Sequence, residues 1–308
     1  MIVVDRHIDL KTTGNFLTLC GIADLHLLCE IDKAEKREHE RKGRAIFDPL
    51  NKEAWHYLHH CMAEVVGMPK YYGKVMTFLG GDTTELERSS IRKAKRQAYH
   101  KNDSRAEDQM YKYAMREYVI PRVKTFVKGT DFIGGVAGNH LIDFSDESLH
   151  RNSEEYIIKT LGGVYGGEAM LLLNLHISYG SKRRLIKVVI QHGTKGGTKT
   201  SIIRELQAMY GMFGEVHCLI KCHAHDPMTA FYAKYNPPTS QDIKHIGKTE
   251  TLVMCLGATR DGMKIGYDDY SERCNYAPTA DRYPMAIFHA YRDNLTQGLN
   301  IKIRPLTM

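Results

Sequence analysis

Short apolar runs, separated by stretches with helical periodicity, recur along most of the chain. Ten runs of four to eight mostly apolar residues are predicted to be strands: 16–23, 75–79, 132–137, 171–177, 185–190, 218–221, 229–233, 251–255, 286–290 and 300–303. Continuous apolar runs of this kind are typical of strands that are covered on both faces.

Helical patterns occupy several of the gaps between these runs. Apolar residues recur at helical spacing in residues 51–66, 107–127 and 201–213. Pro121 should kink or interrupt the second helix, because proline lacks the backbone N–H that a helix needs. Thr200 or Ser201 is expected to cap the third. Alternating strands and helices predict an α/β fold.

No repeat or linker divides the chain, so residues 1–308 are expected to form a single domain. Residues of about 32–44 are predicted to be a charged, solvent-facing insertion, and residues of about 85–128 a basic helical insertion. The second stretch holds twelve basic and six acidic residues, an excess that nearly equals the net charge of +7. Such an excess favours a polyanionic partner such as nucleic acid, although a solvated helix face is the simpler alternative.

Composition narrows the class of protein further. Hydrophobic residues make up 43% and charged residues 26%, as in ordinary globular domains. The first ten residues include Asp5, Arg6, His7 and Asp9, which excludes a signal-peptide core there, and no uncharged run is long enough for a membrane helix. Seven scattered cysteines without a C-x-x-C pair argue against a disulfide framework. The expected location is therefore cytoplasmic.

Polar side chains follow the predicted strands at the points where those strands end. Five of them come directly after an apolar run: Asp24, Asp82, Asn139, His192 and His223. Carboxyl ends of strands meet at one edge of an open α/β sheet. Asp24-Leu25-His26 and His223-Ala224-His225 each place two ligand-type side chains on one side of an extended segment. This mixture of nitrogen and oxygen donors suits Mn, Fe, Zn or Ni better than Mg or Ca.

The order D-x-H, G-D, G-N-H, H, H-x-H resembles that of the calcineurin-like metallophosphoesterases. In this chain the motifs are Asp24-Leu25-His26, Gly81-Asp82, Gly138-Asn139-His140, His192 and His223-Ala224-His225. Each motif alone is weak, but five in the same order are specific. The resemblance implies a four-layer α-β-β-α sandwich, in which two mixed sheets are flanked by helices.

The resemblance also implies a dinuclear metal site. Asp24, His26 and His225 would hold one divalent ion, Asn139, His192 and His223 would hold the other, and Asp82 would bridge them. Mn²⁺ is the first expectation for both ions, with Fe, Zn and Ni as alternatives. A hydroxide between the ions would attack the phosphate in line. His140 would protonate the leaving oxygen or stabilise the transition state. This chain has Cys222 where the family usually has glycine.

Several other motifs have two interpretations each. Residues 193–200 (GTKGGTKT) fail the P-loop pattern, because Thr198 stands before Lys199 where glycine is required. Lys195 and Lys199 either contact substrate phosphate or belong to a plain turn. Arg273 lies in the loop 271–283 and either binds substrate or packs within the loop. Residues 162–167 (GGVYGG) are predicted to be a turn.

Two further groupings resemble metal sites on spacing alone. A separate metal site at His56, His59 and His60, or a zinc knuckle at Cys218, Cys222 and the 223–225 histidines, is less favoured than ordinary packing.

These expectations together favour a metal-dependent enzyme that hydrolyses a phosphodiester in nucleic acid or a nucleotide. One alternative is a phosphomonoesterase or phosphoprotein phosphatase. Another is a non-catalytic binding protein on the same fold, although a complete ligand set argues against it. The sequence leaves open the physiological substrate, the native metals and the oligomeric state, and basic charge does not distinguish DNA from RNA.

Overall fold

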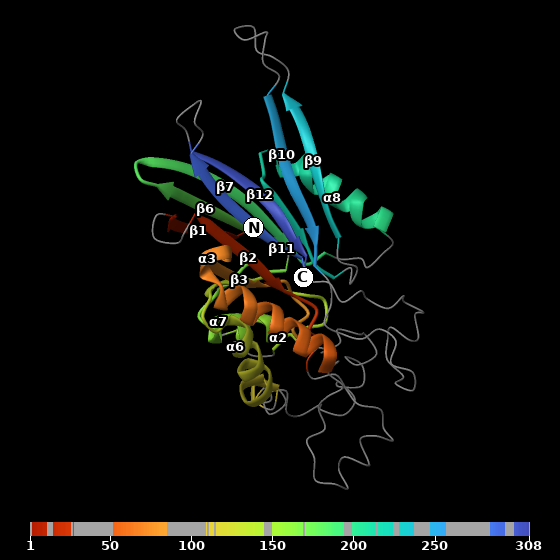
Figure 1. Ribbon diagram of the computed structural model, residues 1–308. Coiled ribbons are helices and arrows are strands. Elements are labelled where there is room, and N and C mark those ends of the chain that lie inside the picture. The colour runs from red at the N-terminus through yellow and green to blue at the C-terminus, as the bar shows by residue number, and fades with distance from the viewer. Residues whose placement is uncertain are drawn as a thin grey trace.

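Two mixed six-stranded sheets pack face to face, and helices cover both outer faces (Figure 1). The computed structural model describes residues 2–10, 15–25, 27, 52–84, 109, 111–113, 115–144, 150–168, 170–193, 199–213, 215–223, 228–236, 247–256, 284–292 and 299–307. The arrangement is the four-layer α-β-β-α sandwich that the family resemblance implies, and it agrees with the α/β fold that the sequence pattern predicts.

The first sheet has the strand order β1-β6-β7-β8-β10-β9. Its strands are β1 (Ile2–Asp9), β6 (Leu171–Tyr179), β7 (Lys182–Gln191), β8 (Cys218–Lys221), β10 (Gly247–Cys255) and β9 (Met228–Asn236). β7, β8 and β10 run parallel to one another. Their carboxyl ends therefore share one edge of the sheet.

The second sheet has the order β12-β11-β2-β3-β4-β5. Its strands are β12 (Leu299–Thr307), β11 (Pro284–Arg292), β2 (Phe16–Ile22), β3 (Lys74–Leu79), β4 (Asp131–Gly135) and β5 (Val164–Tyr165). The four strands from β2 to β5 are parallel, and β11 and β12 are antiparallel additions at one edge. The carboxyl ends of the neighbouring strands β2, β3 and β4 therefore lie at the same edge of the sheet.

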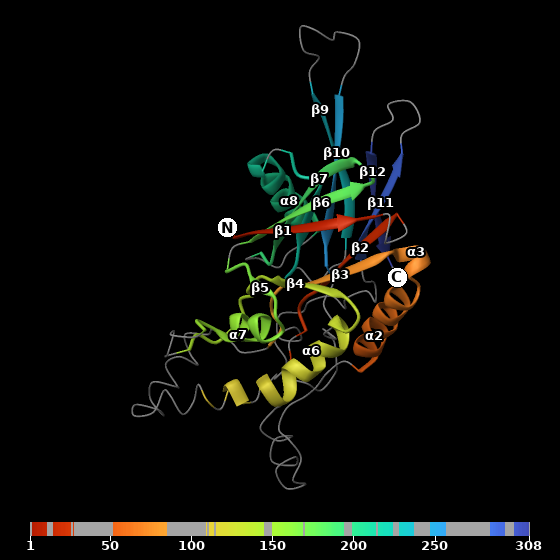
Figure 2. The same ribbon diagram turned by 90° about the vertical axis from the view of Figure 1, so that its left-hand side faces the viewer.

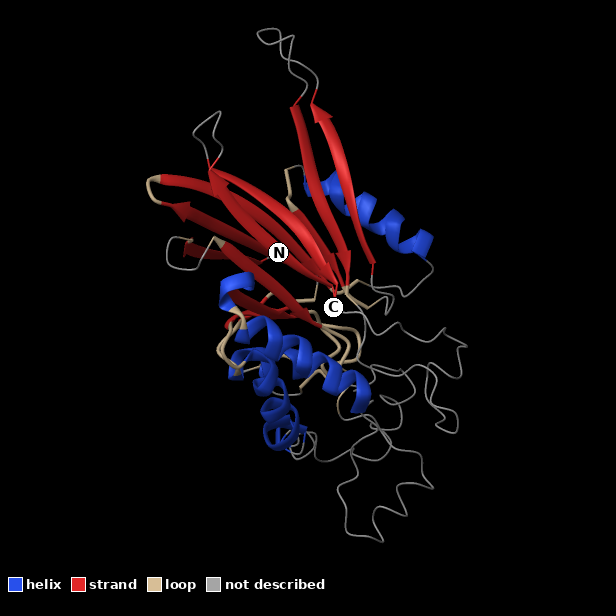
Figure 3. Cartoon of the chain, viewed as in Figure 1, coloured by secondary structure: helices blue, strands red, loops and turns tan. Residues whose placement is uncertain are grey.

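Helices lie on opposite sides of the two sheets (Figures 2 and 3). The second sheet is covered by α2 (Lys52–Gly67), the π-helical η1 (Met115–Val119), α6 (Ile120–Val127) and α7 (Ser153–Thr160), with the short α3 (Pro69–Tyr72) following α2. The first sheet is covered by α8 (Lys199–Phe213). None of the helices among these residues is long and apolar enough to cross a membrane.

Strand alternation divides the apolar residues among three layers of core. In β2, Leu17 and Leu19 point between the sheets, whereas Cys20 and Ile22 point toward the helices. Phe78 of β3 is fully buried between the sheets, and Leu219 of β8 packs against α8. Burying one such side chain stabilises the fold by about 1.5–3 kcal/mol relative to leaving it in water. One layer of core therefore lies between the sheets, and the other two lie between each sheet and its helices.

The ten predicted strands are all confirmed, with ends shifted by a few residues. β1 and β5 were not predicted. The prediction of a turn over residues 162–167 is wrong at its centre, because Val164 and Tyr165 pair with Gly134 and Gly135 of β4.

In place of a break at Pro121, the predicted helix 107–127 changes type near it. The π-helical η1 ends at Val119, and α6 follows directly with Pro121 in its first turn. The predicted cap of the third helix is wrong. α8 begins at Lys199, so Thr200 and Ser201 are already helical. Residues 32–44 and 85–108 lie outside the part of the chain that is described.

Candidate metal centre

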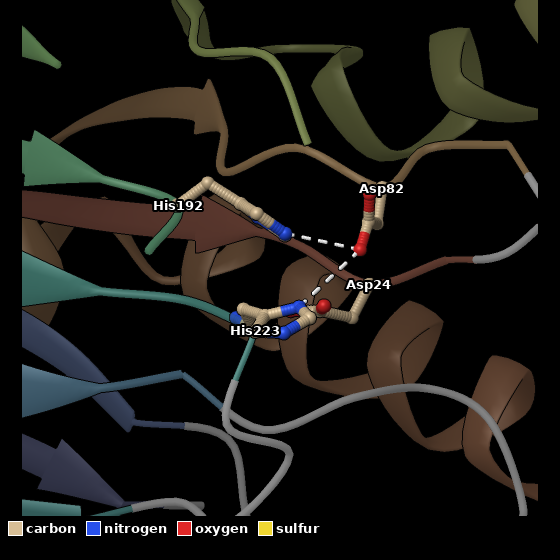
Figure 4. A group of neighbouring side chains, drawn as sticks. All are labelled: Asp24, Asp82, His192 and His223. Atoms are coloured by element: carbon tan, nitrogen blue, oxygen red, sulfur yellow. Dashed lines mark hydrogen bonds and ion pairs between the residues drawn. The ribbon is translucent and has the colours of Figure 1, made fainter. Parts of the chain in front are cut away.

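Side chains from both sheets converge where their parallel strands end (Figure 4). Asp24 follows β2, Asp82 follows β3, His192 follows β7 and His223 follows β8. One ligand-type atom from each of these four residues lies within 4.8 Å of the others. A buried group of two carboxylates and two imidazoles is a donor set that can hold a metal ion.

Asp82 lies at the centre of this group. Its Oδ2 is 3.0 Å from His192 Nε2 and 3.6 Å from His223 Nδ1, so that one carboxylate oxygen faces two imidazoles. Asn139 Oδ1 is 3.0 Å from the same Nε2 of His192. The structure therefore brings together five of the predicted metal ligands, since Asp24 Oδ2 also accepts a hydrogen bond from the backbone N–H of His223, at 3.1 Å.

The backbone is strained at three of these residues. Asp24, Asp82 and His223 have φ angles of 53°, 49° and 68°, in the left-handed region that side chains with a Cβ rarely adopt. Each such residue costs on the order of 1–3 kcal/mol and persists only where the surroundings enforce it. A hydrogen bond of 3.0 Å from Asp24 N to Gly81 O ties two of the turns together. Strain of this kind clusters at functional sites.

Close packing explains the glycines of the Gly-Asp and Gly-Asn-His motifs. A Cβ on Gly138 would lie 1.9 Å from Asp82 Oδ1 and 2.2 Å from Asp82 N. A Cβ on Gly81, whose φ is 96°, would lie 2.7 Å from His192 Nδ1. The turns that carry Asp82, Asn139 and His192 can approach one another because these two positions have no side chain.

His192 is oriented by a backbone carbonyl behind it. Its Nδ1 donates to Gly80 O at 2.7 Å, which directs Nε2 toward the oxygens of Asp82 and Asn139. Burial lowers the pKa of this imidazole, but the hydrogen bond to Asp82 and the charges of Asp82 and Asp24 outweigh it and raise the pKa to about 9. Because Nδ1 carries the proton donated to Gly80 O, the lone pair of Nε2 would face two oxygen acceptors, which is unfavourable unless a positive charge lies between them. A proton or a metal cation meets that need, and metal-binding histidines typically have this carbonyl contact.

Sequence reasoning missed Glu154, a fully buried carboxylate of α7 beside the Asp82 turn. Its Oε1 and Oε2 accept hydrogen bonds from Thr83 N and Thr83 Oγ1, at 2.8 and 2.9 Å. Burial raises its pKa to about 7, with a further contribution from the charge of Asp82, although the Thr83 hydrogen bonds act in the opposite direction. Asn152 caps α7 by accepting from Glu155 N, a spacing typical of helix starts, but that pattern marks the helix and not the burial of Glu154.

The predicted catalytic residue His140 is also at the site. Its backbone N–H donates to Asp82 Oδ1 at 2.8 Å, which places the residue directly beside the central carboxylate. The role of its imidazole toward a leaving group stays a prediction. His26, His225, Lys195 and Arg273 lie outside the described residues, as does the side chain of Lys199, whose backbone begins α8.

Cys222 lies behind the site. It is fully buried between the sheets, and a Cβ on Gly80 would lie 2.3 Å from its sulfur. Its thiol therefore packs against the residue whose carbonyl orients His192. Cys218 is likewise a buried strand residue, as expected from ordinary packing.

In the histidine grouping on α2, His59 makes packing contacts. Its ring is tilted against that of Phe126, and its Nε2 lies 3.1 Å from Thr125 Oγ1. Among the described residues, the group around Asp82 is the one that meets the geometric requirement for a metal site.

Comparison with known proteins adds little to this picture. No protein-family model matches the chain, and no curated protein does so either. One solved structure, from Streptococcus pneumoniae TIGR4, is described as a conserved uncharacterized protein and predicted phosphoesterase. It is 10% identical, aligns over 95% of this chain and 98% of its own, and has a TM-score of 0.32. A similarity this low supports no functional conclusion, which has to come from the site itself.

Proposed function

We propose that this protein is a metal-dependent phosphoesterase whose site is centred on Asp82. One observation carries the proposal. Oδ2 of Asp82 faces His192 Nε2 at 3.0 Å and His223 Nδ1 at 3.6 Å, and Asn139 Oδ1 approaches the same His192 nitrogen at 3.0 Å. A carboxylate oxygen that faces two imidazoles from different strands is the arrangement expected of ligands that converge on a divalent cation.

In this proposal the site holds two divalent ions. Asn139, His192 and His223 would hold one ion, Asp24 with His26 and His225 the other, and Asp82 would bridge them. Mn²⁺ is the first candidate, and Fe, Zn or Ni also suit this nitrogen and oxygen set. When bound, the ions would supply Lewis-acid charge and lower the pKa of a water molecule for attack on phosphorus.

The chain itself has the remaining tasks in this proposal. The Gly80 carbonyl holds the His192 ring in the tautomer that presents Nε2 to the site. The backbone N–H of His140 donates a hydrogen bond to Asp82. The imidazole of His140 would protonate the leaving oxygen of a phosphodiester. The motif order shared with calcineurin-like metallophosphoesterases supports this assignment.

The comparison that tests the function uses wild type, Asp82→Asn and His140→Asn. Each is supplied with Mn²⁺ and assayed on bis-p-nitrophenyl phosphate and on p-nitrophenyl phosphate. We expect wild type to hydrolyse the diester faster, and both variants to lose most of that activity. Faster monoester hydrolysis would indicate a phosphomonoesterase. Equal activity in all three proteins would contradict the assigned site, and no hydrolysis by wild type would favour a binding protein.

We further propose nucleic acid as the polyanionic partner. In the described part of the basic segment, η1 and α6 direct Met115 and Phe126 into the core and leave Arg116, Lys124 and Lys128 exposed. Exposed cations on a helix face suit a phosphate backbone. Binding of DNA or RNA measured by fluorescence anisotropy should then weaken steeply between 50 and 200 mM salt, by roughly 10³-fold or more if six phosphates are contacted. Binding that is absent or independent of salt would contradict this proposal.

A further inference from the structure

The first turn of α7 contacts both loops that carry the central site residues. Ser153 and Glu154 are fully buried there, although neither residue type is commonly found without solvent exposure. Asn152 fixes the start of the helix by accepting a 2.9 Å hydrogen bond from Glu155 N. The turn is therefore a rigid element with two polar side chains directed into the protein.

Glu154 binds the loop after β3. Its two carboxylate oxygens accept from the backbone N–H and the hydroxyl of Thr83, at 2.8 and 2.9 Å. Thr83 directly follows Asp82, whose φ of 49° needs enforcement by its surroundings. The paired contact fixes both the position and the rotation of the residue next to the strained carboxylate.

Ser153 binds the loop after β4. Its Oγ accepts from Ile142 N at 3.1 Å, and its own N–H donates to Ile142 O at 2.9 Å. Ile142 lies two residues after His140 in the loop that begins with Asn139. This loop also touches the first, because His140 N donates to Asp82 Oδ1 at 2.8 Å and Thr84 Oγ1 donates to His140 O at 3.5 Å.

The geometry points to Glu154 and Ser153 as positioning residues, which set the spacing between Asp82 and the Asn139–His140 loop from a single helical turn. This inference rests on the proposed metal-dependent activity. Neither side chain contacts the ligand atoms, so both act through Thr83 and Ile142. A displacement of either loop would change the 3.0 Å distances from His192 Nε2 to Asp82 and to Asn139.

Burying a carboxylate costs free energy that an uncharged side chain making the same structural contact would not cost. Burial alone disfavours the charged form of Glu154, and the nearby charge of Asp82 adds to that cost. A charged acceptor forms stronger hydrogen bonds than an amide, however, and here two oxygens engage two donors of one residue. These two hydrogen bonds to Thr83 therefore help to hold the neighbouring Asp82 in its strained backbone conformation.

The test compares Glu154→Gln with Glu155→Gln. Glutamine keeps the size of Glu154 but presents an NH₂ group to one of the two Thr83 donors. Glu155 lies in the same helical turn and accepts from Arg151 N at 2.8 Å and pairs with Lys159, away from Thr83. The control therefore makes the same chemical change without touching the loop. Thr83→Val is a second variant, which removes only the hydroxyl contact.

Calorimetric titration with Mn²⁺ alone is the first measurement, followed by kcat and KM for bis-p-nitrophenyl phosphate at saturating metal. We expect Glu154→Gln to bind Mn²⁺ about 10–100-fold more weakly than wild type, which is typical of lost contacts behind metal ligands. The Mn²⁺ affinity of Thr83→Val should lie between those of wild type and Glu154→Gln. At saturating metal, kcat should fall about 10-fold or more while KM changes little, since misplacement acts on the reacting geometry.

Each outcome decides between the two inferences. If wild type binds no metal, the proposed function fails. If wild type binds metal and both Glu154→Gln and Thr83→Val bind it with wild-type affinity and kcat, the positioning role is refuted, even if their melting temperatures fall. A loss of metal affinity in Thr83→Val with unchanged binding in Glu155→Gln supports the positioning role, whether or not Glu154→Gln folds.

Discussion

Replacing Gly138 by alanine tests how tightly the two ligand-bearing loops are packed. The added Cβ would lie 1.9 Å from Asp82 Oδ1 and 2.2 Å from the backbone nitrogen of Asp82. Because ordinary contact begins at 3.4 Å, the oxygen and the Cβ have to separate by about 1.5 Å. One obstacle is backbone, so a side-chain rotation alone does not relieve the clash.

The size of the effect follows from that displacement. Moving the carboxylate by about 1 Å breaks the 2.8 Å bond from His140 N and changes the distance to His192. A misplacement of 1 Å reduces catalysis by roughly 10²-fold, which corresponds to about 2.7 kcal/mol in the activation barrier. Mn²⁺ affinity should fall in parallel, because the displaced carboxylate belongs to the proposed bridging residue.

Gly138→Ala is compared with Gly211→Ala by Mn²⁺ calorimetry and diester hydrolysis. Gly211 lies within α8, and nothing lies within 4 Å of a Cβ built there. Alanine should stabilise that helix by about 0.5–1 kcal/mol and leave the site intact. Wild-type metal affinity and turnover in Gly138→Ala would refute the proposed geometry around Asp82.

Three more predictions follow from burial and charge. In the presence of a chelator, Glu154 favours folding when protonated. That stabilisation is full below a pH near 4.5 and is lost as the pH rises through about 7. Urea unfolding should show wild type losing about 3 kcal/mol relative to Glu154→Gln across this range, and parallel pH profiles would contradict it. Adding Mn²⁺ at 100 times its Kd should stabilise wild type by about 2.7 kcal/mol, whereas an unchanged melting temperature would exclude a native metal site. Leu173→Ala, between the sheets, should cost about 2–5 kcal/mol in urea unfolding with little change in Mn²⁺ affinity.

The fold was largely predictable because strands covered on both faces leave unbroken apolar runs. β1 escaped prediction because it is an edge strand whose burial pattern leaves only Val4 and Ile8 fully buried, among charged residues. β5 escaped because two residues between glycine pairs make no periodic signal. Strand-end position was enough to identify Asp24, Asp82, Asn139, His192 and His223 as site candidates.

Glu154 could not be identified in this way. Its burial depends on how α7 meets the Asp82 turn, and glutamate in a helix is ordinarily exposed. The left-handed backbone at Asp24, Asp82 and His223 could not be predicted either, because aspartate and histidine usually adopt negative φ angles. Tertiary packing imposes both features, and no local pattern reports them.

The left-handed backbone at Asp24, Asp82 and His223 also affects which mutations would stabilise the protein. Glycine adopts a positive φ without steric cost, so Asp24→Gly or Asp82→Gly would remove strain together with a candidate ligand. Random mutagenesis screened only for thermal resistance should therefore enrich substitutions at these candidate ligand positions. Selection for folding alone would therefore tend to replace these residues, and the proposed metal site would be lost with them.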